Sequence, residues 1–351
     1  MTDLRLANVQ ALRGMAALLV FLFHSRHLYD ALSGTVLPLQ WIANAGYIGV
    51  DLFFAISGFI MWHTCRQLPA SPQVARAFLL RRGIRIFAGY WPVLLLTTVV
   101  FYVAGWSFTP DVNWFHSVWL TSIKLKQLAI PYSWSLTFEL YFYLLFAVVL
   151  LQMPSRRWWC VLGFALLVAG LKWALSHWFL IGYINRLFYH PLMLEFLLGI
   201  GVWQLVMRQW PHGCWLGLYG LVLVLLASGV AQEYNILRRV LTTGVGCAGL
   251  LALACWLEQQ GRVAPRWLVA WGDASYTVYL LHFLAISLVE QTGWVSWFMG
   301  ASLWLCELAW WLFVVGFCLF CLLFFRAVER PLYRRLSRRM PRPVTVTLDA
   351  S

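Results

Sequence analysis

The sequence predicts an all-helical protein with about ten transmembrane helices, and its composition is the main reason. Of its 351 residues, 62% are hydrophobic and only 11% are charged, less than half of the charged share of an ordinary soluble domain. This apolar content would fill ten segments of about 20 residues, which is the length that spans a bilayer. A soluble protein is therefore excluded, and the short connections leave no room for a second folded domain.

The apolar runs, taken in chain order, give the expected helices. They cover about residues 7–28, 46–65, 85–105, 134–153, 158–180, 187–207, 214–230, 239–258, 275–297 and 301–325. The first run is interrupted by Arg13 and lacks a small-residue cleavage site, so we expect a retained helix rather than a signal peptide.

Cationic side chains predict the orientation. With the N-terminus inside, 18 of the 26 cationic residues fall in cytoplasmic segments and six on the opposite side, which favours two cytoplasmic termini. Residues 1–330 then form one transmembrane domain, and 331–351 form a basic cytoplasmic tail that either lies against anionic headgroups or serves only as a topology signal. The net charge of +13 needs no nucleic-acid partner.

The sequence lacks the motifs of several common classes of enzyme and metal site. The eight cysteines show no paired spacing of a zinc site, so we expect most of them to be buried small hydrophobes and no metal to be bound. No G-x-S-x-G elbow, HExxH helix or phosphate loop is present, which weighs against serine hydrolases, zinc proteases and P-loop enzymes. The chemistry is therefore expected to depend on histidine.

The first span carries two ionisable residues, and such groups inside a bilayer are functional candidates by default. Arg13 and His24 are 11 residues apart, so they share a helix face about 16 Å apart. A guanidinium can hold an anionic donor, and a histidine can take a proton from a hydroxyl. Spacing alone equally allows a polar face that pairs with neighbouring helices.

The fourth span opens with a polar stripe. Ser135, Glu139 and Tyr143 follow one another at intervals of four residues, so they lie on one helix face that must meet protein or water. Glu139 could orient a catalytic histidine, or it could simply satisfy a buried arginine.

Arg82 and Arg85 lie three residues apart before the third span and would share a face at the cytoplasmic surface. Paired guanidiniums suit a phosphate ligand, although ordinary positive-inside anchoring is the favoured interpretation of this pair on spacing alone. The other intramembrane polar residues predict only hydrogen bonds between helices. They are Asp51, Glu195, His282, Glu290 and Glu307.

These motifs together resemble the acyltransferase-3 family of integral-membrane acyltransferases over essentially the whole chain. The matching features are Arg13-x10-His24, the segment from Gly49 to Phe59, Arg82-x-x-Arg85, the stripe from Trp134 to Tyr143, Ser275-Tyr276 with Tyr279 and His282, and the closing Glu329-Arg330-Pro331-Leu332. One departure is Ala88, where the family often has proline, so we expect a different break between the basic segment and the third span.

The resemblance implies transfer of an acetyl group from cytoplasmic acetyl-CoA to a sugar hydroxyl of a surface or lipid-linked glycan, in a bacterial inner membrane. It makes His24 the catalytic histidine, with Glu139 in or beside the active site, and it assigns Arg13, Arg82 and Arg85 to the donor. The residues expected to support the site are Asp51, Ser57, Trp134, Ser135, Tyr143, Tyr279 and His282.

Two alternatives remain open from the residues. His24 acts either as a general base for direct transfer or as a nucleophile that forms an acetyl-histidine intermediate. Buried Arg, His and Glu also occur in proton-coupled transporters, although no inverted repeat is evident. A non-catalytic scaffold is disfavoured, because it gives no reason to bury so many charges.

Overall fold

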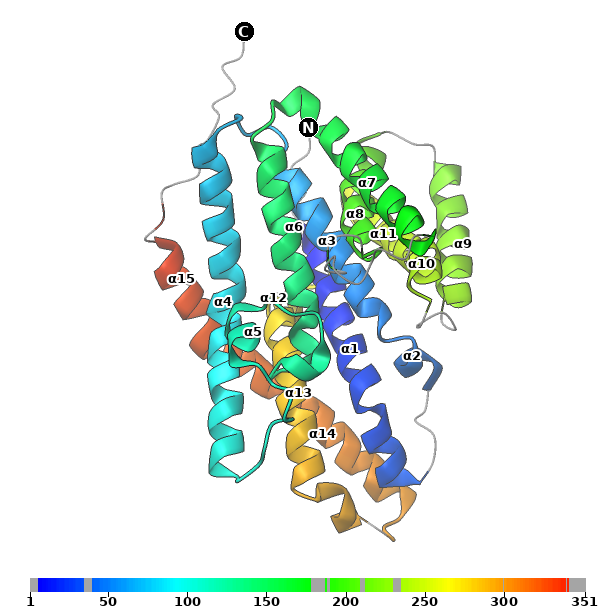
Figure 1. The fold of residues 1–351 in the computed structure, drawn as a ribbon. Coiled ribbons are helices and arrows are strands. Elements are labelled where there is room, and N and C mark those ends of the chain that lie inside the picture. The colour runs from blue at the N-terminus through cyan, green and yellow to red at the C-terminus, as the bar shows by residue number, and fades with distance from the viewer. Residues whose placement is uncertain are drawn as a thin grey trace. The chain divides into compact units, whose positions relative to one another are not determined.

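The computed structural model describes residues 6–34, 40–177, 187, 190–208, 212–229, 235–298, 300–338 and 340, and within them it is helical without any β-strand (Figure 1). The α-helices are α1 (Ala7–Ser33), α2 (Gln40–Asn44), α3 (Ile48–Cys65), α4 (Pro72–Val103), α5 (Trp114–Trp119), α6 (Trp134–Leu150), α7 (Arg157–His177), α8 (Met193–Met207), α9 (His212–Gly229), α10 (Ile236–Arg239), α11 (Val245–Gln259), α12 (Arg266–Asp273), α13 (Ser275–Gln291), α14 (Leu303–Phe324) and α15 (Arg330–Arg338).

A helix coincides with each of the ten predicted spans, which confirms the all-helical class. Six helical segments of the described chain are long and apolar enough to cross a membrane, or seven if the pair of α12 and α13, bent by 61°, counts as one span. Helix α8 and residues 213–228 of α9 are apolar but shorter. The count of ten spans and the position of the termini stay predictions.

The third predicted span starts much earlier than its hydropathy indicates. Helix α4 runs without a break from Pro72, so Arg82 and Arg85 belong to the same helix as the apolar run that follows them. Proline is favoured in the first turn of a helix because its missing N–H is not needed there. Ala88 is buried inside α4 at 2% exposure, and the expected break is absent.

The chain divides into two compact units. Unit 1 contains residues 1–53, 89–134 and 253–331, and unit 2 contains residues 54–88, 135–252 and 332–351. Each unit is built from segments that are distant in sequence, so each active-site candidate below depends on long-range helix packing rather than on local sequence.

In unit 1, α1 packs along α12 and α13 (Figure 1). A Cβ on Gly14 would collide with Trp271, and one on Gly272 would collide with the backbone oxygen of Gln10. The Trp271 indole Nε1 donates a hydrogen bond to the backbone oxygen of Gly14 at 2.9 Å. Small residues thus let the two backbones approach closely, as is common where helices meet in a membrane.

The first turn of α1 is held by an acidic side chain of α11. The backbone N–H groups of Ala7 and Asn8 donate to the two carboxylate oxygens of Glu258 at 3.0 and 2.8 Å. The Asn8 amide also bonds the backbone of Ala254, Arg262 and Ala264. Two of the free N–H groups of this helix end are therefore satisfied, and a negative charge lies at its positive pole.

Unit 2 brings α3 and α8 together through a reciprocal pair of glycines. A Cβ on Gly58 would collide with the backbone oxygen of Phe196, and one on Gly199 would collide with the backbone oxygen of Ala55. Beside them the rings of Phe54 and Phe196 stack at 4.5 Å. This contact between α3 and α8 explains why the second-span motif has a glycine at position 58.

Arg157 is fully buried in unit 2 and joins the ends of two helices. Its guanidinium donates to the backbone oxygens of Cys65 at 2.9 Å, Arg66 at 3.0 Å and Leu150 at 3.1 Å, and its Nε donates to Gln152 at 3.1 Å. These carbonyls lie at the C-terminal ends of α3 and α6, where backbone oxygens lack helical partners. Five of the eight cysteines are buried, as predicted.

We expect Gly199→Ala to destabilise the protein by about 1–3 kcal/mol, because its new methyl group overpacks the contact with α3. Gly201→Ala is the matched control on the same helix, since its added Cβ would meet no other helix within 4 Å. Alanine favours a helix over glycine by up to ~1 kcal/mol, so the control should be neutral or stabilising. Thermal unfolding of both variants in nanodiscs checks this, and equal midpoints would contradict the proposed contact.

Candidate active site

Three rings stack in unit 1, and they come from three separate segments. His24 lies on α1, His282 lies on α13, and Tyr132 lies in the short turn before α6. The ring centroids of His24 and Tyr132 are 3.8 Å apart, those of Tyr132 and His282 are 4.6 Å apart, and those of the two histidines are 5.3 Å apart. The structure therefore brings together two histidines that lie 258 residues apart in the sequence.

His282 has one nitrogen bound and one nitrogen open. Its side chain is fully buried, and its Nδ1 makes a hydrogen bond with the backbone oxygen of Tyr279. Because a carbonyl can only accept, Nδ1 carries the proton and Nε2 keeps its lone pair when the ring is neutral. Within the described chain, Nε2 is buried and has no hydrogen-bond partner, which is unusual for a buried polar atom.

His24 differs from His282 in its exposure. It is half-buried, and among the described residues no hydrogen bond ties up its ring. Contacts with Tyr132 and with Phe23, whose ring centroid is 5.0 Å away, hold the imidazole in place. An imidazole that is positioned by packing and has its nitrogens available can exchange a proton with a bound hydroxyl.

Tyr132 was not predicted as a site residue. The hydroxyl of Tyr279 donates to its backbone oxygen at 2.6 Å, which fixes the turn that carries the ring. Tyr279, which was predicted as a supporting residue, therefore holds both this turn and the Nδ1 side of His282. In a chain with 60 aromatic residues a single tyrosine gives no sequence signal.

Arg13 also belongs to unit 1. It is half-buried on α1, and its Nη1 donates to the side-chain oxygen of Gln10 at 2.9 Å. With α1 continuous from Ala7 to Ser33, the predicted separation of about 16 Å between Arg13 and His24 along one helix holds. Asp51, another predicted supporting residue, is fully buried in this unit.

The predicted polar stripe of the fourth span forms a cluster in unit 2. Oε1 of Glu139 accepts a hydrogen bond from Ser57 at 3.1 Å and another from the Tyr143 hydroxyl. Ser57 comes from α3, so the stripe joins α6 to α3. Ser135 is buried in this unit, whereas Trp134 is half-buried and belongs to unit 1.

Arg82 lies beside this cluster. Its guanidinium carbon is 5.9 Å from the ring centroid of Tyr143 and 5.7 Å from that of Phe78. Arg85 is 5.7 Å from the ring of Tyr333 on the basic helix α15. The two arginines thus differ in their ring neighbours, and both interact electrostatically with Tyr143 of this cluster.

His24 and Glu139 belong to different units. Their pairing in catalysis therefore stays a prediction, and each cluster is described by itself.

Two other acidic residues bear out the expectation of hydrogen bonds between helices. Glu290 of α13 pairs with His27 of α1 at 2.7 Å. Glu307 of α14 accepts from the Tyr29 hydroxyl of α1 and from the Trp311 indole. These contacts stabilise helix packing in unit 1. They do not involve the ring stack, whose two histidines remain available for chemistry.

Comparison with known proteins identifies the class. Residues 6–327 match the family described as "Acyltransferase domain". The chain is 30% identical to "Acyltransferase MdmB" of Streptomyces mycarofaciens, over 80% of this chain and 79% of that protein. It is 31% identical to "Exopolysaccharide production protein ExoZ" of Rhizobium meliloti, over 71% of this chain and 79% of that protein.

A further relative is the "Putative membrane-bound transacylase BcsY" of Komagataeibacter xylinus, which is 25% identical over 80% of this chain and 73% of that protein. No solved structure matches. The chain belongs to the acyltransferase-3 family and is an integral-membrane O-acyltransferase. The comparisons give no support to a transporter.

We expect Tyr132→Ala to lower acyl transfer by about tenfold or more, because it removes the ring that packs against both histidines. Tyr132→Phe keeps that ring and should retain most of the activity. The rate of acyl transfer by the two purified variants checks this, provided that thermal unfolding shows both to be as stable as the wild type. An equally large loss in Tyr132→Phe would show that the hydroxyl matters instead of the packing.

Proposed function

We propose that this enzyme transfers an acetyl group from acetyl-CoA to a hydroxyl of a surface or lipid-linked glycan, with His24 as the general base. The observation that carries the proposal is the half-buried imidazole of His24, held by the rings of Tyr132 and Phe23 and left without a hydrogen-bond partner among the described residues. The glycan as acceptor is supported by the printed name of the relative from Rhizobium meliloti, an exopolysaccharide production protein. The proposed location is a bacterial cytoplasmic membrane.

In the proposed reaction, His24 takes the proton of the sugar hydroxyl while the oxygen attacks the carbonyl carbon of the thioester. The carbon–sulfur bond then breaks, and the CoA thiolate leaves and receives the proton from the imidazolium. General-base catalysis of this kind contributes ~10²–10⁴-fold to a rate. The other route passes through an acetyl group on His24, and mass spectrometry that trapped this species would overturn direct transfer.

The donor is proposed to contact Arg82, Arg85 and Arg13. Arg82 and Arg85 lie one helical turn apart on α4, and CoA carries phosphate groups that suit guanidinium ligands. Glu139 is proposed to act close to the reaction, and its bonds with Ser57 and Tyr143 hold its carboxylate in one orientation. No metal takes part in this mechanism.

The test of the proposed function is CoA release from acetyl-CoA by protein in nanodiscs with glycan extract. We expect His24→Ala to lower the rate by ~10²–10⁴-fold, because the base is lost. His116→Ala, a substitution in α5, is the matched control and should stay within about twofold. Equal activity of His24→Ala and wild type would remove His24 from the mechanism.

We further expect Arg82→Ala to raise the Kd for acetyl-CoA by about tenfold, which corresponds to ~1.4 kcal/mol. Arg81→Ala is the control, since among the described residues the Arg81 Nε donates to the Ala77 backbone oxygen alone, at 3.2 Å. Binding of acetyl-CoA and of its analogue without the 3′-phosphate should be measured by calorimetry. Equal losses in both variants would indicate general anchoring by positive charge rather than a phosphate site.

A further inference from the structure

The segment between α4 and α6 folds back along α4 before it reaches Tyr132. Helix α5 lies beside the middle of α4 (Figure 1), where the Trp91 indole Nε1 donates to the backbone oxygen of Val118 at 3.0 Å. Trp91 precedes the end of α4 at Val103 by 12 residues, which is about 18 Å of helix. The chain thus returns along α4 by this length before it forms the turn that carries Tyr132.

Tyr90 holds the returning chain from inside unit 1. Its side chain is fully buried, and its hydroxyl donates to the backbone oxygen of Ser117 in α5 at 2.6 Å. The side chain of Ser133, which directly follows Tyr132, is a further polar neighbour of this hydroxyl. A buried tyrosine usually places its hydroxyl on a partner, and here the partners are α5 and the turn of the ring stack.

Ser117 connects α5 to the residues that precede Tyr132. Its buried hydroxyl oxygen accepts a hydrogen bond from the backbone N–H of Ala129 at 2.9 Å and donates one to the backbone oxygen of Asn113 at 3.0 Å. Ala129 lies three residues before Tyr132, and the residues from 128 to 130 are each 1% exposed. Because this stretch is buried and bonded to Ser117, a shift of α5 would move the turn that follows it.

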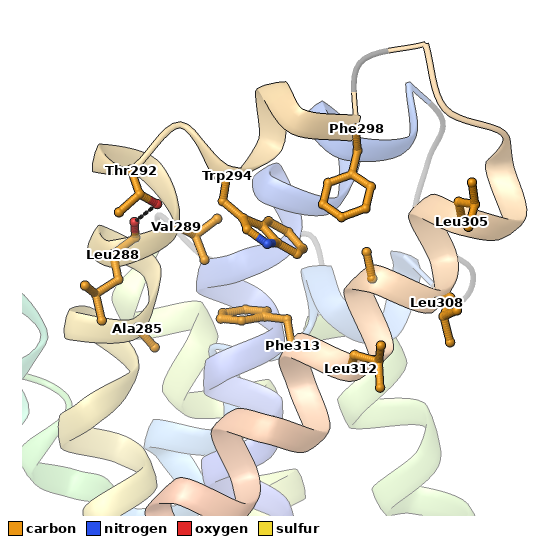
Figure 2. A pocket seen from close by; sticks show the side chains of 11 residues that line it. Ala285, Leu288, Val289, Thr292, Trp294, Phe298, Leu305, Leu308, Leu312 and Phe313 are labelled. Carbon is orange, nitrogen blue, oxygen red and sulfur yellow. Dashed lines mark hydrogen bonds between the residues drawn. The ribbon is translucent and has the colours of Figure 1, made fainter.

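A second tyrosine hydroxyl holds the same turn from α13, where Tyr279 donates to the backbone oxygen of Tyr132 at 2.6 Å. The following part of α13 contributes to another feature, an apolar pocket of about 600 Å³ that it forms with α14 (Figure 2). Among the described residues that line this pocket, none belongs to the ring stack or carries an ionisable side chain. The hydrogen bonds that hold the turn therefore come from Tyr279 and from the side of α4.

We propose that Tyr90 is a positioning residue for acyl transfer, because its hydroxyl holds the turn that places the Tyr132 ring between His24 and His282. The inference rests on the proposed function. One side chain makes the ring contacts of 3.8 and 4.6 Å with the two histidines, so a displaced turn disturbs both imidazoles together. Tyr90 thus acts on His24 through Tyr132.

The kinetics of CoA release test this with Tyr90→Phe, which removes only the hydroxyl. We expect kcat to fall about fivefold or more and the KM for acetyl-CoA to change less than about twofold, since the proposed donor arginines are untouched. Tyr102→Phe is the matched control on the same helix, because its side chain is 86% exposed, and it should keep the wild-type kcat. 4-Aminophenylalanine at position 90 retains a donor and should restore most of the activity. Equal kcat of Tyr90→Phe and wild type would overturn the proposal.

A double variant separates positioning from a general loss of packing. If Tyr90 acts through the Tyr132 ring, adding Tyr90→Phe to Tyr132→Ala should lower kcat less than about twofold further, because coupled residues are not additive. Two independent effects would instead multiply. A multiplied loss in the double variant would therefore overturn the proposal.

Fluorine NMR reads the place of the ring directly. 3-Fluorotyrosine at position 132 of the full-length protein in nanodiscs gives one resonance, whose chemical shift is sensitive to the flanking imidazoles. We expect Tyr90→Phe to shift or broaden this resonance, as His24→Ala does, and Tyr102→Phe to leave it unchanged. If Tyr90→Phe does not fold, Ser117→Ala removes the next link and carries the same expectation. An unchanged resonance in the folded variant would overturn the proposal.

The resonance is read without acetyl-CoA or glycan, so it is independent of turnover. Loss of activity in His24→Ala, together with an unchanged resonance and unchanged kcat in Tyr90→Phe, would count against the positioning role alone. Equal CoA release by wild type and His24→Ala would count against the proposed function, and the positioning role would fall with it even if the resonance shifted.

Discussion

The backbone contact between α1 and α12 at Gly14 and Gly272 is the constraint on which the histidine pair depends. It sets the rotation of α1 against the helices that follow residue 265, and a slip by one residue would turn each α1 side chain by about 100°. His24 would then leave the ring of Tyr132, and the first turn would lose the carboxylate of Glu258. The glycine contact, the capped N-terminus and the ring stack thus fix the same register of α1 at three levels along its length.

The polar groups described above differ in how their hydrogen-bonding capacity is satisfied. Asn8, Glu307 and Arg157 are surrounded by hydrogen-bond partners and hold helices together. His24 and the Nε2 atom of His282 lack such partners in the described chain. Leaving a buried polar atom unsatisfied costs about 1–3 kcal/mol, and proteins tend to retain such groups where a substrate completes the bonding. Helix packing therefore accounts for Asn8, Glu307 and Arg157, whereas the two histidines keep ring nitrogens that a substrate could bind.

Hydropathy predicted where helices lie because each apolar run must be buried or face lipid, and the structure has a helix at every expected span. It failed at the start of α4, since arginines at helical spacing lower the mean hydropathy without ending the helix. The polar stripe of Ser135, Glu139 and Tyr143 could be predicted from its period, and so could the involvement of Ser57 through its motif. The ring of Tyr132 and the meeting of His24 with His282 could not, because contacts between distant helices leave no local pattern in one sequence. The same limit applies to Arg157, whose contacts with the ends of two helices have no local pattern in the sequence.

The carbonyl contacts of Arg157 also bear on how the chain assembles during synthesis. An arginine keeps its charge in any environment that a protein offers, so it cannot enter the bilayer interior cheaply as a neutral group. Every oxygen that receives its hydrogen bonds, from Cys65 to Gln152, precedes it in the chain. Proteins are made from the N-terminus, so all four acceptor carbonyls are synthesised before this side chain. No segment that follows Arg157 in the chain is needed to satisfy its guanidinium.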